Sequence, residues 1–146
     1  MNSMDLTQIL GASQAPNLQR FSLYLPDSDR DNAPVPRLEE WIEAAMLVFA
    51  DVNGGTTRLP LAQGIWKPEN CGATVREATT IVYSFIRDTD RFERGVERLA
   101  VFAHTFGKHA NQGEVMVEFS GEVSGRGFVS RAYFIEAYPK AGESPF

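Results

Sequence analysis

The polar side chains best suited to chemistry gather in the stretch GKHANQGEVMVEF, residues 107–119. Four of them stand close together where a helical pattern gives way to a strand pattern: His109, Asn111, Gln112 and Glu114. An imidazole can take up or release a proton near neutral pH, and the two amides could hold a polar ligand. The same residue types also end helices and turn the chain. The stretch therefore indicates either a ligand site or a turn.

Glu77 is a second candidate, because a carboxylate on a strand could serve as a general base if it is partly buried. In an extended strand it points to the same side as Thr79 and Tyr83, whereas Arg76 points to the other side. Glu77 could equally be a solvated residue. Trp66, at the end of a strand-like segment, could close a hydrophobic core or stack on a ring-shaped ligand.

These considerations give two sets of candidates. The expected catalytic candidates are His109, Glu77 and Glu114. The expected ligand-binding residues are Trp66, Glu77, His109, Asn111 and Gln112.

Other constellations lack a required residue. His104 and His109 are five positions apart, about 140° around a helix, so they cannot hold one metal ion from the same face. The segment DSDRDN resembles the start of a calcium loop, but the glycine position holds Asn32 and the last position holds Leu38. Cys71 is the single cysteine, which excludes an internal disulfide and a thiolate zinc cluster. We therefore expect no metal and no cofactor.

Composition limits the possible partners. The chain has 146 residues and a net charge of −5, which argues against nucleic acid or an anionic membrane as the main partner. The N-terminal segment is typical neither of a secretion signal nor of a membrane helix, so a cytoplasmic location is expected. We expect a loose lead-in over residues 1–19, a single domain over 20–138 and a flexible tail over 139–146.

Periodicity predicts the elements of that domain. An apolar stripe at helical spacing runs through residues 38–52 and a second one through residues 92–106, where Gly107 is expected to end or loosen the helix. Strands are predicted at 21–26, 56–66, 74–86, 114–123 and 127–138, and Pro60 indicates that the second of these either lies at a sheet edge or begins after the proline. The last two strands are expected to form a hairpin through Ser124 and Gly125.

This order predicts an α+β protein of the ferredoxin-like class, with a β-α-β-β-α-β pattern and an extra C-terminal strand. Its two helices would cover one face of an antiparallel sheet. The other face would be left with exposed apolar residues, and we therefore expect a homodimer through the open sheet face.

Short motifs in residues 21–86 resemble a group of small bacterial domains of unknown function. The matching segments are LYLP, a helix with EEW, LPLAQGIW and TVREATTIVYSF, in which the corresponding residues are Leu23, Tyr24, Trp41, Gly64, Trp66, Arg76 and Glu77. The resemblance implies the fold and no particular reaction.

The leading functional expectation is a dimeric small-ligand-binding or regulatory domain without catalysis, since no complete catalytic set is evident. The alternative is a small hydrolase or lyase for a polar metabolite, with His109 as acid–base and Glu77 or Glu114 assisting. A second alternative is a protein-inhibitor or interaction module with an acidic surface.

Overall fold

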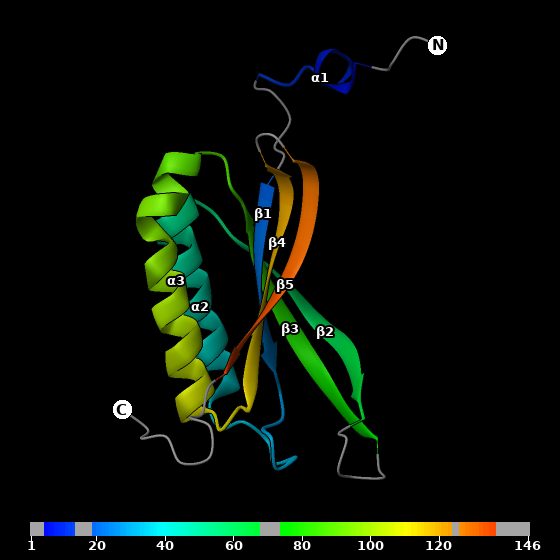
Figure 1. Ribbon diagram of the computed structural model, residues 1–146, viewed down its shortest axis with the longest axis vertical. Helices are drawn as coiled ribbons and strands as arrows, with labels where there is room; N and C mark the ends of the chain where they lie inside the picture. Colours follow the sequence, from blue (N-terminus) through cyan, green and yellow to red (C-terminus); the bar gives the residue numbers. More distant parts are fainter. Residues whose placement is uncertain (1–4, 14–18, 68–73, 124–125, 137–146) are drawn as a thin grey trace.

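The computed structural model describes residues 5–13, 19–67, 74–123 and 126–136. Its core elements are five strands and two long helices: β1 (Gln19–Pro26), α2 (Leu38–Asn53), β2 (Thr57–Trp66), β3 (Val75–Phe85), α3 (Thr89–His109), β4 (Glu114–Val123) and β5 (Gly127–Glu136). A short helix, α1 (Leu6–Ile9), lies within the predicted lead-in. The predicted α+β class is confirmed (Figure 1).

All five strands form one antiparallel sheet in the order β2-β3-β1-β4-β5. The hairpins β2–β3 and β4–β5 therefore flank the central strand β1. The loop between β4 and β5, with Ser124 and Gly125, lies outside the described residues, as do residues 137–146 at the C-terminus.

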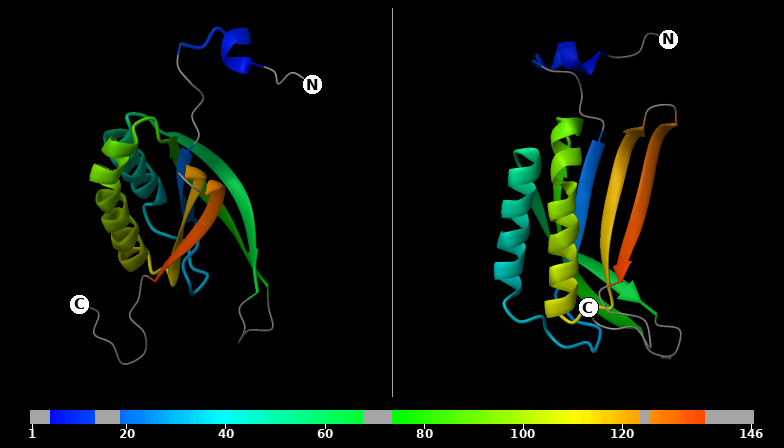
Figure 2. Two further views of the ribbon diagram at one scale, coloured as in Figure 1. Left: turned by 45° about the horizontal axis from the view of Figure 1, so that its top comes forward. Right: turned by 60° about the vertical axis from the view of Figure 1, so that its left-hand side comes forward.

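Helices α2 and α3 lie side by side on one face of the sheet (Figure 2). The buried core between the two layers includes Leu23 and Leu25 of β1, Phe49 of α2, Phe106 of α3 and Val115 of β4. In β1, residues at even positions such as Ser22 and Tyr24 alternate with these and face the side without helices. One face of the sheet is thus packed by helices, as the sequence predicts.

The two helices approach each other closely at Gly95. A Cβ atom at this position would lie 2.9 Å from Cγ1 of Val52, so α3 can pack against α2 here only because the residue is a glycine.

An ion pair between Arg58 of β2 and Glu39 of α2 connects the sheet to a helix, with both guanidinium–carboxylate contacts at 2.9 Å. The pair lowers the pKa of Glu39, mainly through the hydrogen bond from Arg58.

β2 lies at the edge of the sheet, as Pro60 predicts. Its pairing with β3 changes register between Leu59 and Ala62, the stretch that contains the proline without an amide donor. Beyond this irregularity the β2–β3 hairpin extends away from the helices (Figures 1 and 2).

The expected end of the second helix is wrong. α3 continues through Gly107, which is buried, and ends at His109, with Ala110 as the C-cap and Asn111 in the left-handed conformation at φ 53°. The helix begins at Thr89, and its N-cap Asp88 accepts a hydrogen bond from the Arg91 backbone N–H at 3.1 Å. Because the helix is longer than predicted, His109 is its last residue and does not lie in the turn that follows.

Candidate functional site

A pocket of about 670 Å³ lies on the sheet face without helices, where β1 ends and β4 begins. Side chains from separate elements line it, among them Tyr24 of β1, Glu77 of β3, Glu114 of β4 and Phe134 of β5. Asp29 and Arg30, from the loop after β1, close one side. We call this cavity the sheet-face pocket.

Alternation along the strands explains why these side chains meet. Tyr24 pairs in register with Ile81, and Met116 of β4 pairs with Phe134, so residues two positions apart on each strand share the open face. Glu77 lies on that face because it is an even number of residues from Ile81. The pocket thus combines carboxylates with aromatic and apolar walls.

The charges around the sheet-face pocket are of both signs. Three carboxylates line it, Asp29, Glu77 and Glu114, together with the cations Arg30 and Lys67. Burial raises the pKa of the Tyr24 phenol, and the nearby carboxylate of Glu118 raises it further. Tyr24 is therefore neutral at physiological pH and can donate its phenolic hydrogen to a ligand.

Asn111 supports the wall of this pocket. Its Nδ2 donates to Oδ2 of Asp29 at 3.0 Å and to Oδ2 of Asp31 at 2.9 Å, while its backbone oxygen accepts from Arg30 N at 3.1 Å. The hydrogen bond from Asn111 is the main reason that the pKa of Asp29 is lowered. Asn111 ties the loop after β1 to the end of α3.

Gln112 makes a second tie between the same segments. It is 5% exposed, and its Nε2 donates to the backbone oxygens of Ser28 at 3.1 Å and Ala110 at 3.2 Å. Gln112 also lines the sheet-face pocket. The two predicted amides therefore hold the loop, and Gln112 also borders the cavity.

His109 does not lie with them. Its ring stacks on Trp41 of α2, with centroids 6.3 Å apart and planes 24° apart, in the helix layer. The sheet separates this layer from the face that carries Glu77 and Glu114. The structure thus brings together Glu77, Gln112 and Glu114 of the predicted site and leaves His109 outside; Trp66 is the last residue of β2.

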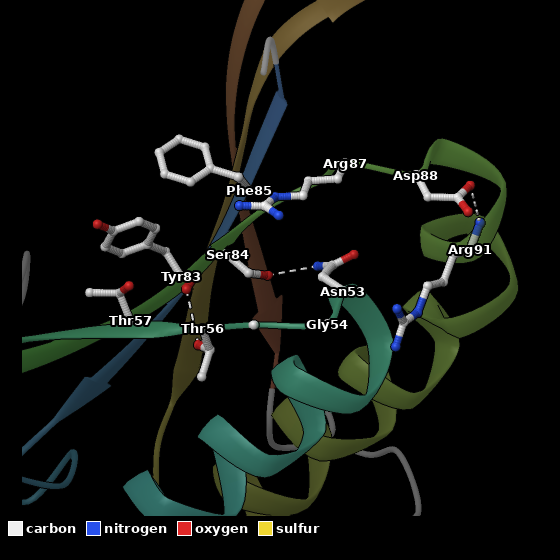
Figure 3. Close-up of a pocket in the computed structure, with 11 residues that line it drawn as sticks. Asn53, Gly54, Thr56, Thr57, Tyr83, Ser84, Phe85, Arg87, Asp88 and Arg91 are labelled. Carbon is white, nitrogen blue, oxygen red and sulfur yellow. Dashed lines mark hydrogen bonds between the residues drawn. The ribbon is translucent and has the colours of Figure 1, made fainter. Parts of the chain in front are cut away.

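A second pocket, of about 460 Å³, lies at the other end of the sheet (Figure 3). It is formed where α2 ends, β3 ends and α3 begins, and its polar lining includes Asn53, Arg87, Asp88 and Arg91. We call it the helix-end pocket. The sequence does not predict this pocket.

The class of protein defined by this fold is an α+β domain with an antiparallel sheet and helices on one face. No family model and no curated protein matches the chain. Among the described residues, no three His, Cys, Asp or Glu side chains are grouped so that they could hold a metal ion. No helix within the described ranges is long and apolar enough to cross a membrane.

Two solved structures share the fold over most of both chains. One is a phage SAM lyase in complex with S-methyl-5'-thioadenosine, with a TM-score of 0.59, 15% identity, and coverage of 84% of this chain and 92% of that one. The other is a phage SAM lyase in the apo state, with a TM-score of 0.60, 14% identity, and coverage of 86% and 94%.

These comparisons correct the leading functional expectation. A binding or regulatory domain without catalysis is contradicted, because the structures that share the fold are lyases. Of the residues named for the alternative of a small enzyme, Glu77 and Glu114 line the sheet-face pocket, whereas His109 stacks on Trp41 and does not line it.

Proposed function

We propose that the chain is a small lyase that cleaves a carbon–sulfur bond of a sulfonium nucleoside such as S-adenosylmethionine, and that the substrate binds in the sheet-face pocket. The observation that carries the proposal is the grouping of Glu77 and Glu114 with Tyr24 and Phe134 around one cavity. The shared fold with phage SAM lyase supports the substrate class.

The pocket suits such a substrate in size and chemistry. Its volume of about 670 Å³ falls in the range typical of small-molecule sites. A sulfonium is a fixed cation, which carboxylates and aromatic faces attract. Lys67 on the rim can pair with the carboxylate of the amino-acid part.

The reaction breaks the bond between the sulfonium sulfur and the γ-carbon of the amino-acid side chain. The electron pair of that bond goes to sulfur, which leaves as a neutral thioether. The γ-carbon is satisfied either by attack of the substrate's own carboxylate or by loss of a β-proton to a base. Glu77 or Glu114 can orient the cation in both routes, and either can accept the proton in the second.

The test is to incubate the purified protein with S-adenosylmethionine and to follow S-methyl-5'-thioadenosine by liquid chromatography. We expect release above the spontaneous rate. Glu77→Gln removes the charge and keeps the shape, so it should lower kcat/KM by about tenfold or more. Glu122→Gln, at the far end of the same sheet face, is the matched control.

Two results would contradict the proposal. One is the absence of thioether release by the folded wild-type protein at high enzyme concentration. The other is an equal loss of activity in Glu77→Gln and Glu122→Gln, which would place the chemistry outside the sheet-face pocket.

We also infer that β1–α2–β2–β3–α3–β4 is a ferredoxin-like unit to which β5 is added, an inference supported by the strand order and by the two helices on one face.

The predicted homodimer through the open sheet face is supported by exposed apolar side chains on that face: Leu59, Phe85, Phe128 and Phe134. Light scattering at micromolar protein tests it, and a monomer would contradict it.

A further inference from the structure

Asn53 leaves a hydrogen-bonding atom unsatisfied at the helix-end pocket. The residue is 9% exposed, and its Nδ2 donates to Oγ of Ser84 at 2.7 Å. Its Oδ1 has no hydrogen-bond partner among the residues that the structure describes. The Ser84 hydroxyl can donate as well as accept, so one amide atom stays unpaired in either orientation of the amide. Buried polar atoms rarely remain so unless a ligand or water pairs with them.

Two arginines stand beside this amide. Figure 3 shows the nitrogen of Asn53 turned to Ser84 and its oxygen turned away from it, and Arg87 and Arg91 line the same pocket. Arg87 makes no ion pair or hydrogen bond with any residue in the described ranges. Arg91 donates from Nη2 to the backbone oxygen of Asp51 at 2.9 Å, which fixes its guanidinium at the pocket.

The backbone at Gly54 also leaves space for the guanidinium of Arg91. Gly54 has a φ of +86°, and a Cβ here would lie 3.1 Å from Nη1 of Arg91. A side chain at Gly54 would therefore be strained and would push against the guanidinium.

We propose that the helix-end pocket binds the α-amino-carboxylate group of a free amino acid. The carboxylate would pair with the guanidinium groups of Arg87 and Arg91, while the ammonium group would donate to Oδ1 of Asn53 and to the carboxylate of Asp88. This site is additional to the proposed lyase site, because the two pockets share no lining residue.

In the orientation that the structure shows, the unpaired atom of Asn53 is the acceptor Oδ1, which selects this chemistry over a plain anion. A phosphate ester is largely a dianion at neutral pH and offers no hydrogen to Oδ1 of Asn53, whereas an ammonium group offers three. The pocket of about 460 Å³ leaves room for an amino-acid side chain next to the exposed ring of Phe85. Since Oδ1 is covered, a ligand reaches it only after a shift of neighbouring side chains. Arg87 and Arg91, which line the pocket, are both exposed.

The experiment is an NMR titration of the full chain with each of the proteinogenic L-amino acids in turn. We expect at least one of them to shift the amide resonances of Gly54, Gly55 and Thr56 in a saturable way. Arg87→Gln should weaken that binding by about tenfold, the typical effect of losing one charge-assisted contact. Arg94→Gln, on an exposed part of α3 outside the pocket, should bind as the wild type does.

The N-acetyl derivative of the best binder tests the role of the ammonium group, and we expect its binding to be lost. The proposal is overturned if no amino acid moves these resonances, if Arg87→Gln binds normally, or if the N-acetyl form or inorganic phosphate binds equally well. Glu77→Gln should retain amino-acid binding, which separates a failure here from a failure of the lyase proposal.

Discussion

The imidazole of His109 lies against the indole of Trp41, with ring centroids 6.3 Å apart and planes inclined by 24°. Trp41 also packs edge-to-face on Phe106, with ring centroids 5.5 Å apart. The histidine therefore extends an aromatic cluster between α2 and α3. The contact places His109 in the helix layer, in the last turn of α3 beyond Gly107.

The first prediction concerns this contact. His109→Ala should lower the free energy of unfolding by about 0.5 kcal/mol, the lower end of the range for an aromatic pair, because the histidine is exposed. It should leave thioether release unchanged. Urea denaturation and the lyase assay measure the two effects. His104→Ala, exposed on the same helix, is the control, and a loss of activity specific to His109→Ala would return His109 to the active site.

The second prediction concerns Asn111 and Asp29. Because the hydrogen bond from Asn111 lowers the pKa of Asp29, Asn111→Gly should raise that pKa towards its usual range. The folded-state pKa is depressed, so the stabilisation is present above the unfolded pKa of about 3.9 and is lost as pH falls through the folded pKa. The variant should therefore lose stability at neutral pH and not in strong acid.

Asn111→Ala separates the amide from the backbone. Residue 111 has a φ of 53°, so alanine should cost about 1 kcal/mol more than glycine at every pH. NMR titration of the Asp29 carboxyl and urea denaturation at several pH values provide the readouts. An unchanged Asp29 pKa in both variants would show that Asn111 does not control this carboxylate.

The third prediction concerns Tyr24. Burial and the carboxylate of Glu118 raise its pKa, so Glu118→Gln should lower it. Since the folded pKa is raised, the neutral phenol contributes stability below the unfolded pKa of about 10, and this contribution is lost as pH rises through the folded pKa. NMR of tyrosine labelled at Cζ resolves the titration. Glu122→Gln should leave the pKa of Tyr24 unchanged. Equal shifts of this pKa in both variants would show that the Glu118 carboxylate is not its cause.

The fourth prediction concerns the contact of Gly95 with Val52. Gly95→Ala should destabilise the fold by about 1 kcal/mol or more, because overpacking outweighs the helix propensity that alanine gains. The same substitution in a Val52→Ala background should be neutral or stabilising relative to Val52→Ala alone. A double-mutant cycle by thermal and urea unfolding measures the coupling, and simple additivity would contradict a steric origin.

The sequence by itself determined the elements with a long apolar period. The stripe over residues 38–52 became α2, and the β-branched run over 74–86 became β3, because burial of one face is encoded by local spacing. Pro60 likewise limited the second strand to a sheet edge or to a start after the proline, since a residue without an amide donor is tolerated at an edge; the strand lies at the edge and begins at Thr57. The α+β class followed from the order of these elements.

Local signals were misleading at the end of α3. A glycine in a helical pattern commonly marks a helix end, but Gly107 is buried and the helix continues to His109. Contacts between α2 and α3 decided this end, and residues 41 and 109 are too distant in sequence for a periodic pattern to relate them. The structure places His109 against Trp41 and not among the residues that line the pocket with Glu77 and Glu114.

Tertiary structure alone decided which polar groups share a cavity. Glu77, Gln112 and Glu114 line one pocket because β3 and β4 both pair with β1. The register of these two pairings sets which side chains of β3 and β4 lie near each other on the open face. The amide oxygen of Asn53, which lacks a partner among the described residues, shares a pocket with Arg87 where α2 and β3 end and α3 begins. Periodicity reports which face of an element is buried, whereas a site depends on the distances between elements, which only the packed chain fixes.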